Sequence, residues 1–104
     1  MVEPGLTHRF PMLRRAIEHQ VVQGRFDESL RLVEELFSLA PDDAGLSKLK
    51  ARFAADLVKR AVQAQKIEAA SRIVELFESK VPAAHLGDQE RQALKRAKED
   101  LVSL

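Results

Sequence analysis

Two stretches of this chain carry nearly the same pattern, the second placed 41 residues after the first. One runs from Gln23 to Pro41 and the other from Ala64 to Pro82. Alignment of 10–41 with 51–82 gives six identical pairs: Val21/Val62, Arg31/Arg72, Val33/Val74, Glu34/Glu75, Ser38/Ser79 and Pro41/Pro82. An internal repeat of this size indicates stacked copies of one supersecondary unit. Because repeated helical units usually present surfaces, the pattern favours a binding module over an enzyme.

Apolar side chains recur at helical spacing along the whole chain, which predicts an all-α fold. The sparse β-branched residues beside Ala, Leu, Glu, Arg and Gln favour helix as well. Five helices are expected, over about 8–23, 27–39, 43–64, 67–80 and 88–102. Their short connections make consecutive helices antiparallel neighbours. The 104 residues are therefore expected to form a single domain, 1–104.

The expected helix ends follow from residues that favour them. Pro11 is placed in the first turn of the first helix, where it loses no internal hydrogen bond, and Gly24 ends that helix. Acidic residues are expected at three helix starts: Asp27 as a cap or first-turn acid, Asp42 or Asp43 as a cap, and Asp88 as a cap.

The segment 27–39 carries apolar residues on two sides. One stripe is Leu30, Val33 and Phe37, and the other is Leu32, Leu36 and Leu39. A helix that is apolar on two sides needs neighbours on both. The fourth and fifth helices are each assigned one inward face. These faces are Ile67, Ala70, Val74, Phe77 and Val81 for the fourth helix, and Leu94, Ala97 and Leu101 for the fifth.

The spacing within 10–41 resembles a tetratricopeptide repeat, a helix–turn–helix unit. Gly24 matches the turn glycine of that family, Phe26 the aromatic after it, Ser29 the small residue at the helix crossing and Pro41 the terminal proline. Ala70 and Pro82 match in the second copy, where Gln65 and Ile67 replace the glycine and the aromatic; Ile17 and Leu36 are also larger than the family prefers. Another helical bundle is the alternative.

The resemblance implies two hairpins and a terminal helix. Repeat 1 would cover about 8–41, repeat 2 about 43–82 with a lengthened first helix, and a capping helix about 88–103. The lengthening adds two helical turns, so 44–50 is expected to project beyond the hairpin. Two repeats bury less than the usual minimum of about three. Either the capping helix closes the array, or two chains form a homodimer through Leu46 and Leu49.

The resemblance also implies a binding groove lined by the first helix of each hairpin. Its residues would be Arg14, Glu18, Val21 and Val22 from the first helix, and Arg52, Ala55, Lys59 and Gln63 from the third. The three basic side chains make this groove mildly cationic, which suits carboxylates of a protein or peptide partner. Glu18 and Ala55 stand where the family's chaperone-tail binders have Asn, which argues against that particular function.

Residues for chemistry are few. The chain has no Cys, and its only imidazoles are His8, His19 and His85. No pair of them has metal-ligand spacing, no serine has a base near it in the sequence, and no glycine-rich phosphate loop is present. We therefore expect no catalytic residue, no metal and no cofactor.

The net charge of +1, with both signs interleaved, argues against nucleic acid as a partner. A nucleic-acid-associated small helical regulator is nevertheless kept as the alternative to a protein-interaction adaptor. The longest apolar runs are far too short to span a bilayer, so no membrane association is expected. The lack of cysteine, with no basic and apolar leader pattern at the N-terminus, predicts a cytoplasmic protein.

Overall fold

A computed structural model describes the backbone of residues 4–103 and the side chains of residues 8–103. The helices are α1 (Pro4–Val22), α2 (Phe26–Ser38), α3 (Ala44–Gln63), α4 (Ile67–Lys80) and α5 (Asp88–Val102), with a short 3₁₀ helix, η1 (Ala83–His85), before the last of them. No strand occurs within these residues, so the predicted all-α class is confirmed.

The helix starts differ from the sequence prediction at two places. Since α1 begins at Pro4, Pro11 lies inside the helix, where the carbonyl of residue 7 loses its helical hydrogen-bond donor. At the start of α5 the capping position is Gly87, not Asp88. There the Glu90 carboxylate accepts a hydrogen bond from the Gly87 backbone N–H at 2.9 Å. The acid that stabilises the start of this helix is thus Glu90, two residues after the predicted Asp88.

The other two acidic positions behave as one of the predicted alternatives. Asp43 caps α3, because its Oδ1 accepts a hydrogen bond from the Leu46 backbone N–H at 3.0 Å. Asp27 lies in the first turn of α2, whose capping residue is Arg25 and makes no side-chain cap. The negative charge of Asp27 still stabilises the positive end of that helix.

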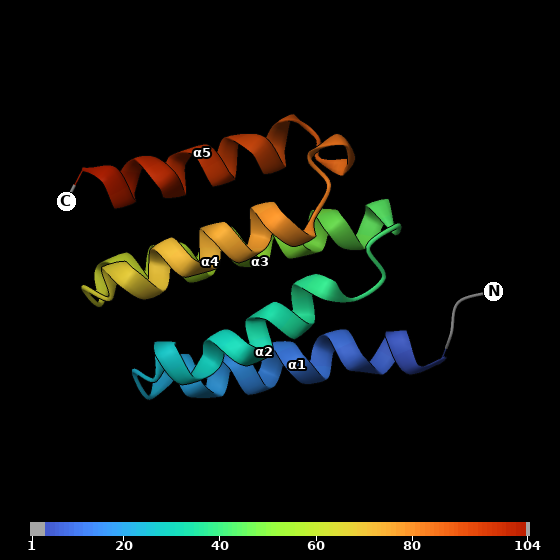
Figure 1. Ribbon diagram of the computed structural model, residues 1–104, viewed down its shortest axis with the longest axis horizontal. Coiled ribbons are helices and arrows are strands. Elements are labelled where there is room, and N and C mark those ends of the chain that lie inside the picture. The colour runs from blue at the N-terminus through green and yellow to red at the C-terminus, as the bar shows by residue number, and fades with distance from the viewer. Residues whose placement is uncertain (1–3, 104) are drawn as a thin grey trace.

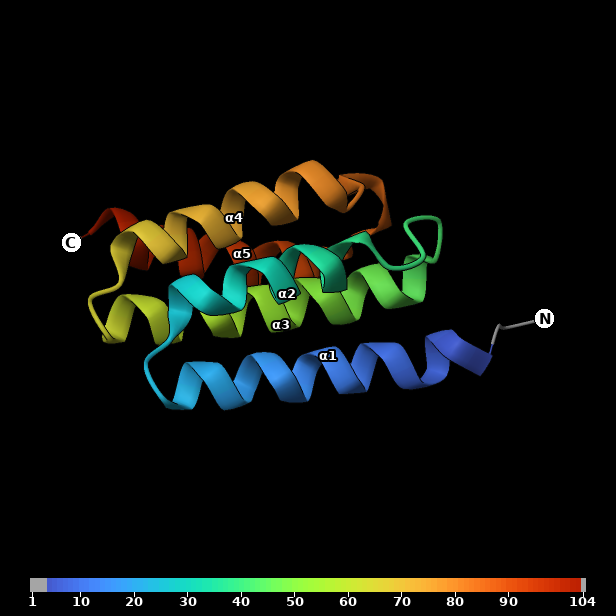
Figure 2. The ribbon, with the colours of Figure 1, turned by 60° about the horizontal axis from the view of Figure 1, so that its bottom comes forward.

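The helices form two layers (Figures 1 and 2). One layer contains α1, α3 and α5, and the other contains α2 and α4. Within the layers, α2 packs against α4 and α3 packs against α5; between them, α1 packs on α2 and α3 on α4. Direct packing between α1 and α3 is slight, and so is packing between α4 and α5. The two hairpins are therefore joined mainly through their second helices.

The two hairpin turns have the same backbone conformation despite different residues. Gly24 has φ 78° and Gln65, 41 residues later, has φ 61°. In both turns a backbone N–H donates to the carbonyl five residues earlier, the pattern of a Schellman motif: Arg25 to Gln20 at 2.9 Å, and Lys66 to Ala61 at 2.8 Å. The repeat is thus reproduced in detail at the turns.

The core between the hairpins is aliphatic with a pair of phenylalanines at its centre. Phe37 of α2 and Phe77 of α4 meet edge to face, with ring centroids 5.5 Å apart and planes at 80°. The prediction that α2 is covered on two sides is confirmed, since Val33, Leu36 and Phe37 are all fully buried.

The predicted inward face of α4 is only partly correct. Ala70, Phe77 and Val81 are buried, but Ile67 and Val74 are only half-buried. A second stripe, absent from the prediction, is buried instead: Ala69, Ile73 and Leu76. In α5, Ala97 is buried whereas Leu94 and Leu101 are half-buried. Helix α4 is therefore apolar on two sides, as α2 is.

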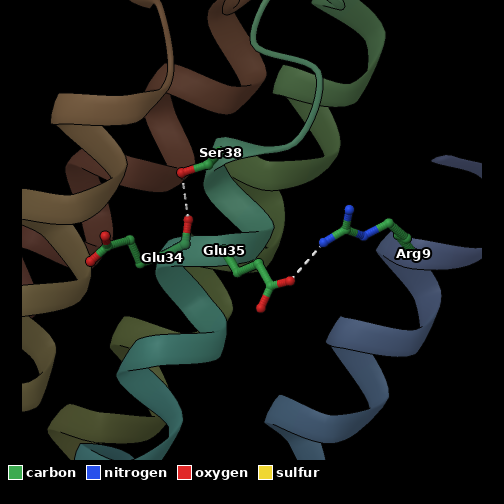
Figure 3. Close-up of polar contacts among 4 residues, drawn as sticks. All are labelled: Arg9, Glu34, Glu35 and Ser38. Atoms are coloured by element: carbon green, nitrogen blue, oxygen red, sulfur yellow. Dashed lines mark hydrogen bonds and ion pairs between the residues drawn. The ribbon is translucent and has the colours of Figure 1, made fainter. Parts of the chain in front are cut away.

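A surface ion pair joins α1 to α2 on the first hairpin. Arg9 Nη2 lies 2.7 Å from Glu35 Oε1. Beside it, Ser38 Oγ donates a hydrogen bond to the Glu34 carbonyl at 2.8 Å. Figure 3 shows how these residues lie. Both partners of the pair are about half exposed, with 55% and 45% of their side-chain surface accessible. Exposed pairs contribute less than about 1 kcal/mol, so packing, not this contact, holds α1 in place.

The first turns of α3 do not project freely, which corrects the prediction for 44–50. Ser47 and Lys50 in this segment are fully buried. η1 packs against α3, and His85 of η1 lies 2.9 Å from Ser47 through its Nδ1. Leu46 is half-buried, and Leu49 is the large hydrophobic residue of this segment that faces outward, with half of its surface exposed.

The positive φ of Gln65 predicts a stabilising substitution. A left-handed conformation costs a non-glycine residue about 1–2 kcal/mol, which glycine avoids. Glycine also raises the conformational entropy of the unfolded chain, and this offsets part of the gain in stability. We expect Gln65→Gly to raise the free energy of unfolding by about 0.5–1 kcal/mol, measured by urea denaturation. Gly24→Gln is the matched reversal and should lower it by a similar amount, because no atom lies within 4 Å of a Cβ at that position. A loss of stability in Gln65→Gly would contradict this account.

Candidate functional site

Lys50 is a fully buried lysine that binds the end of α2. Its Nζ donates hydrogen bonds to the backbone carbonyls of Phe37, at 3.0 Å, and Leu39. The last carbonyls of a helix have no partner within it, so this side chain satisfies two acceptors that would otherwise be buried unpaired. Burial lowers the pKa of Lys50 from its usual 10.5, and the nearby Asp43 carboxylate partly offsets that effect by raising it. Lys50 therefore has a structural use.

Ser47 and His85 form the one serine–histidine contact found among residues 8–103, which the sequence reasoning did not foresee. Ser47 Oγ also donates a hydrogen bond to the Asp43 carbonyl at 3.1 Å. A hydroxyl has one proton, and Ser47 uses it in the hydrogen bond to the Asp43 backbone carbonyl. The imidazole Nδ1 of His85 therefore donates to Ser47 Oγ instead of accepting from it. A nucleophile needs the opposite direction and access to substrate, and Ser47 is fully buried.

Both arginines of the predicted groove already have partners within the chain. Arg14 bonds to Glu18 at 3.0 Å and lies over the Phe53 ring, 5.4 Å from its centroid, so it links α1 to α3. Arg52 turns toward α5, where it lies 3.5 Å from Glu90. Lys59 is exposed. The basic side chains therefore do not converge on one anion-binding surface.

The remaining four predicted residues divide between a hollow and the core. Val21, Val22 and Gln63 line a shallow hollow of about 470 Å³ between the C-terminal ends of α1 and α3. Ala55 is buried and offers no contact surface. The structure thus brings together three of the eight predicted groove residues, and separates them from Arg52.

A larger apolar groove lies between α4 and α5, with α3 beneath it. Its volume is about 760 Å³. The apolar lining comes from three helices: Val58, Val74, Phe77, Val81, Leu94 and Val102. The groove exists because α5 packs extensively on α3 and only slightly on α4.

The rim of this groove carries an acidic residue on the α4 wall and mainly basic residues on the α5 wall. Glu78 stands on the α4 wall, whereas the α5 wall carries three cations and one acid: Arg91, Lys95, Lys98 and Glu99. Lys98 Nζ lies 2.5 Å from Glu78 Oε2, so that pair bridges the groove and neutralises itself. Arg91 makes only a long contact with the Ala83 carbonyl, at 3.4 Å, and no ion pair to Lys95 is formed within residues 8–103. Arg91 and Lys95 therefore have no paired carboxylate within those residues, on a wall that also carries Glu99.

This groove was missed by the sequence analysis, although a signal was present. Ile67 and Val74 were assigned to the inward face of α4, and the separate stripe that includes Ile73 and Leu76 was overlooked. Two apolar stripes on α4 require two covering neighbours, as was argued for α2. Helices α2 and α3 cover most of α4, whereas α5 packs against it only slightly, so the half-buried Val74 is left at the groove.

Other classes of site are not formed by the described part of the chain. Within it, no three His, Asp or Glu side chains gather in a way that could hold a metal ion. None of the helices there has an apolar stretch long enough to cross a membrane.

The buried amine of Lys50 predicts a specific dependence of stability on pH. Between its lowered folded-state pKa and 10.5 the unfolded chain binds a proton that the folded chain has released, so stability rises with pH in that window. The neutral amine keeps two N–H groups for its two carbonyls. We expect Lys50→Met to lose about 2–3 kcal/mol of unfolding free energy at neutral pH, because those acceptors are left unpaired.

The difference in free energy of unfolding between the native chain and Lys50→Met should then widen as the pH is raised toward 10.5. Urea denaturation at a series of pH values measures it. Lys48→Met is the matched control, since Lys48 is exposed, and its gap should stay small and flat. No Cys or Tyr titrates in this range to obscure the effect. A gap for Lys50→Met that narrows with pH would contradict the assignment.

Comparison with known proteins adds no identification, because no family model, no curated protein and no solved structure matches this chain.

Proposed function

We propose that this chain is a non-enzymatic protein-interaction module that binds a helical or peptide segment of a partner protein in the groove between α4 and α5. The observation that carries the proposal is the groove itself, an apolar trough of about 760 Å³ with a charged rim. Binding sites for amphipathic helices have this combination of an apolar floor and polar edges. Interaction modules built from helical pairs also present extended surfaces of this kind.

The groove between α4 and α5 is preferred to the one expected between α1 and α3. The hollow at the ends of α1 and α3 is smaller, and the arginines assigned there are already paired within the chain. A partner that displaced those pairs would gain little net energy, since one ion pair would replace another. The groove between α4 and α5, in contrast, has half-buried apolar side chains whose remaining exposed surface a partner can bury.

The features of the chain that involve reactive residue types have structural explanations, which supports a non-enzymatic role. The Ser47–His85 pair and Lys50 each satisfy buried hydrogen-bonding groups. The lack of cysteine fits the reducing cytoplasm in which we place the protein. The nucleic-acid alternative gains no specific support, since the rim carries the acidic Glu78 and Glu99 as well as basic side chains.

Two valines provide a matched test of the binding site. Val102 lines the α4–α5 groove and is 83% exposed, whereas Val22 lines the α1–α3 hollow and is 80% exposed. We expect Val102→Glu to weaken partner binding at least about tenfold, because a buried unpaired carboxylate is costly, and Val22→Glu to leave it nearly unchanged. Partners captured from host lysate by the native chain, and identified by mass spectrometry, would be titrated against each variant.

Both substitutions are at exposed positions, so both should fold normally. The reverse pattern, with loss of binding only in Val22→Glu, would favour the hollow between α1 and α3. Equal binding by both variants would exclude the α4–α5 groove as the site. Capture that disappears steeply with added salt and with nuclease treatment would favour the nucleic-acid alternative.

Self-association through Leu46 and Leu49 remains a separate prediction. Leu49 is half exposed, so Leu49→Glu should change the free energy of unfolding by no more than about 0.5 kcal/mol. We expect it to weaken self-association, so that the average mass measured by sedimentation equilibrium falls toward that of a monomer. Leu46 is half-buried and packs against the core, so Leu46→Glu should also lower stability. Unchanged mass and unchanged partner affinity in Leu49→Glu would defeat this idea.

A further inference from the structure

The covered face of α2 and the open groove face of α4 are equivalent in the 41-residue repeat. Val33 corresponds to Val74, and Phe37 corresponds to Glu78. Val33 and Phe37 are fully buried, and Phe37 is covered by Phe77 of the second hairpin. Val74 is half-buried and Glu78 exposed, and both line the groove. The groove therefore lies where the repeat would place the next helix of the α2–α4 layer.

We propose that the groove binds one amphipathic helix of a partner protein, which occupies the position of a third helix in the α2–α4 layer and directs acidic side chains toward Arg91 and Lys95. This inference rests on the proposed function and specifies the partner. Since α2 and α4 run in the same direction (Figure 1), the bound helix should run parallel to α4 and antiparallel to α5.

The apolar face of that helix can be described from α4 itself. Helix α4 buries Ala69, Ile73, Leu76 and Phe77, a stripe at positions i, i+4, i+7 and i+8. A helix that sits on α4 as α4 sits on α2 needs the same spacing of apolar residues. The groove wall on α5 extends from Arg91 to Val102, about 16 Å of helix, which is long enough for three turns of a partner helix. A trough of this length suits a helix better than a compact small molecule.

The charges on the rim determine which charged residues the partner helix should carry on the edge that faces α5. Glu78 and Lys98 neutralise one another across the groove. Arg91 and Lys95 are one turn apart on α5, with no carboxylate paired to either within residues 8–103. Acidic residues one turn apart along the partner helix would meet both.

A second copy of the folded chain does not provide this helix. Among residues 8–103, the large hydrophobic side chains that are exposed are Met12, Val22, Leu49 and Val102. They are scattered over three helices, and none of those helices presents a stripe with the required spacing. The occupant is accordingly a helix from a different protein, which folds its apolar face onto α4 and α5.

The test uses two synthetic 20-residue peptides and the full chain. Both peptides carry the i, i+4, i+7, i+8 apolar stripe on an alanine-rich helix; one has glutamates on the edge that would meet α5, and the other has lysines there. A single Trp at the end of each peptide reports binding by fluorescence, since the chain itself has no Trp or Tyr. We expect the acidic peptide to bind about tenfold more tightly than the basic one, the size of a few rim charge pairs.

Charge reversal on the chain should invert the preference. Arg91→Glu/Lys95→Glu should favour the basic peptide, whereas Arg96→Glu/Lys48→Glu, which changes net charge equally at exposed positions outside the groove, should keep the native preference. Val102→Glu should weaken both peptides. Equal binding of the two peptides, or a preference unaffected by Arg91→Glu/Lys95→Glu, would overturn the proposed partner chemistry.

Two further outcomes separate this inference from the function on which it rests. If neither peptide binds while Val102→Glu still abolishes capture of the natural partner, the groove is the site but its ligand is not such a helix. If Val102→Glu affects neither peptide nor partner, the proposed function fails too. A native chain that sediments as a dimer, with Val102→Glu a monomer, would show a second copy in the groove and overturn the inference.

Discussion

The packing of α2 against α4 is the contact on which the rest of the structure depends. It joins the two hairpins through the edge-to-face pair of Phe37 and Phe77, with the fully buried Val33 and Ile73 also in the core. Because α1 and α3 touch only slightly and α2 packs less on α3 than on α4, this interface is the main one between the hairpins. Buried aromatic rings of this kind combine a large apolar area with a preferred geometry, so they fix the orientation of the helices as well as their association.

The fold class and most helix boundaries were predictable because they depend on local signals. Periodicity located α4 correctly at 67–80, and Asp43 was recognised as a possible cap of α3. The 41-residue repeat predicted two equivalent turns, and Gln65 adopts the same left-handed conformation as Gly24. In that case the surrounding hydrogen bonds and the packed helices override the preference of a single residue.

The arrangement of the site was less predictable, because it depends on which faces of the helices meet. The resemblance to a tetratricopeptide repeat led us to expect a surface shared by the first helices of both hairpins. In the structure Arg52 instead turns to Glu90 of α5, and α1 and α3 are largely separate. Lys50, counted as part of a projecting segment, is buried by contacts with carbonyls distant in sequence. Spacing along one helix carries no information about such partners.

The position of α1 at one edge of the molecule affects how the protein moves. Its principal neighbour is α2, whereas α3 is held by α4, α5 and η1. In a linear array of helices, an end unit that touches one neighbour opens at lower free energy than a unit held from several sides. Transient detachment of α1 would bare the outer side of α2 and leave the contact between α2 and α4 closed. Amide exchange should accordingly be faster in this edge helix than along α3, and the opposite end of the array, where the groove lies, would keep its shape during that motion.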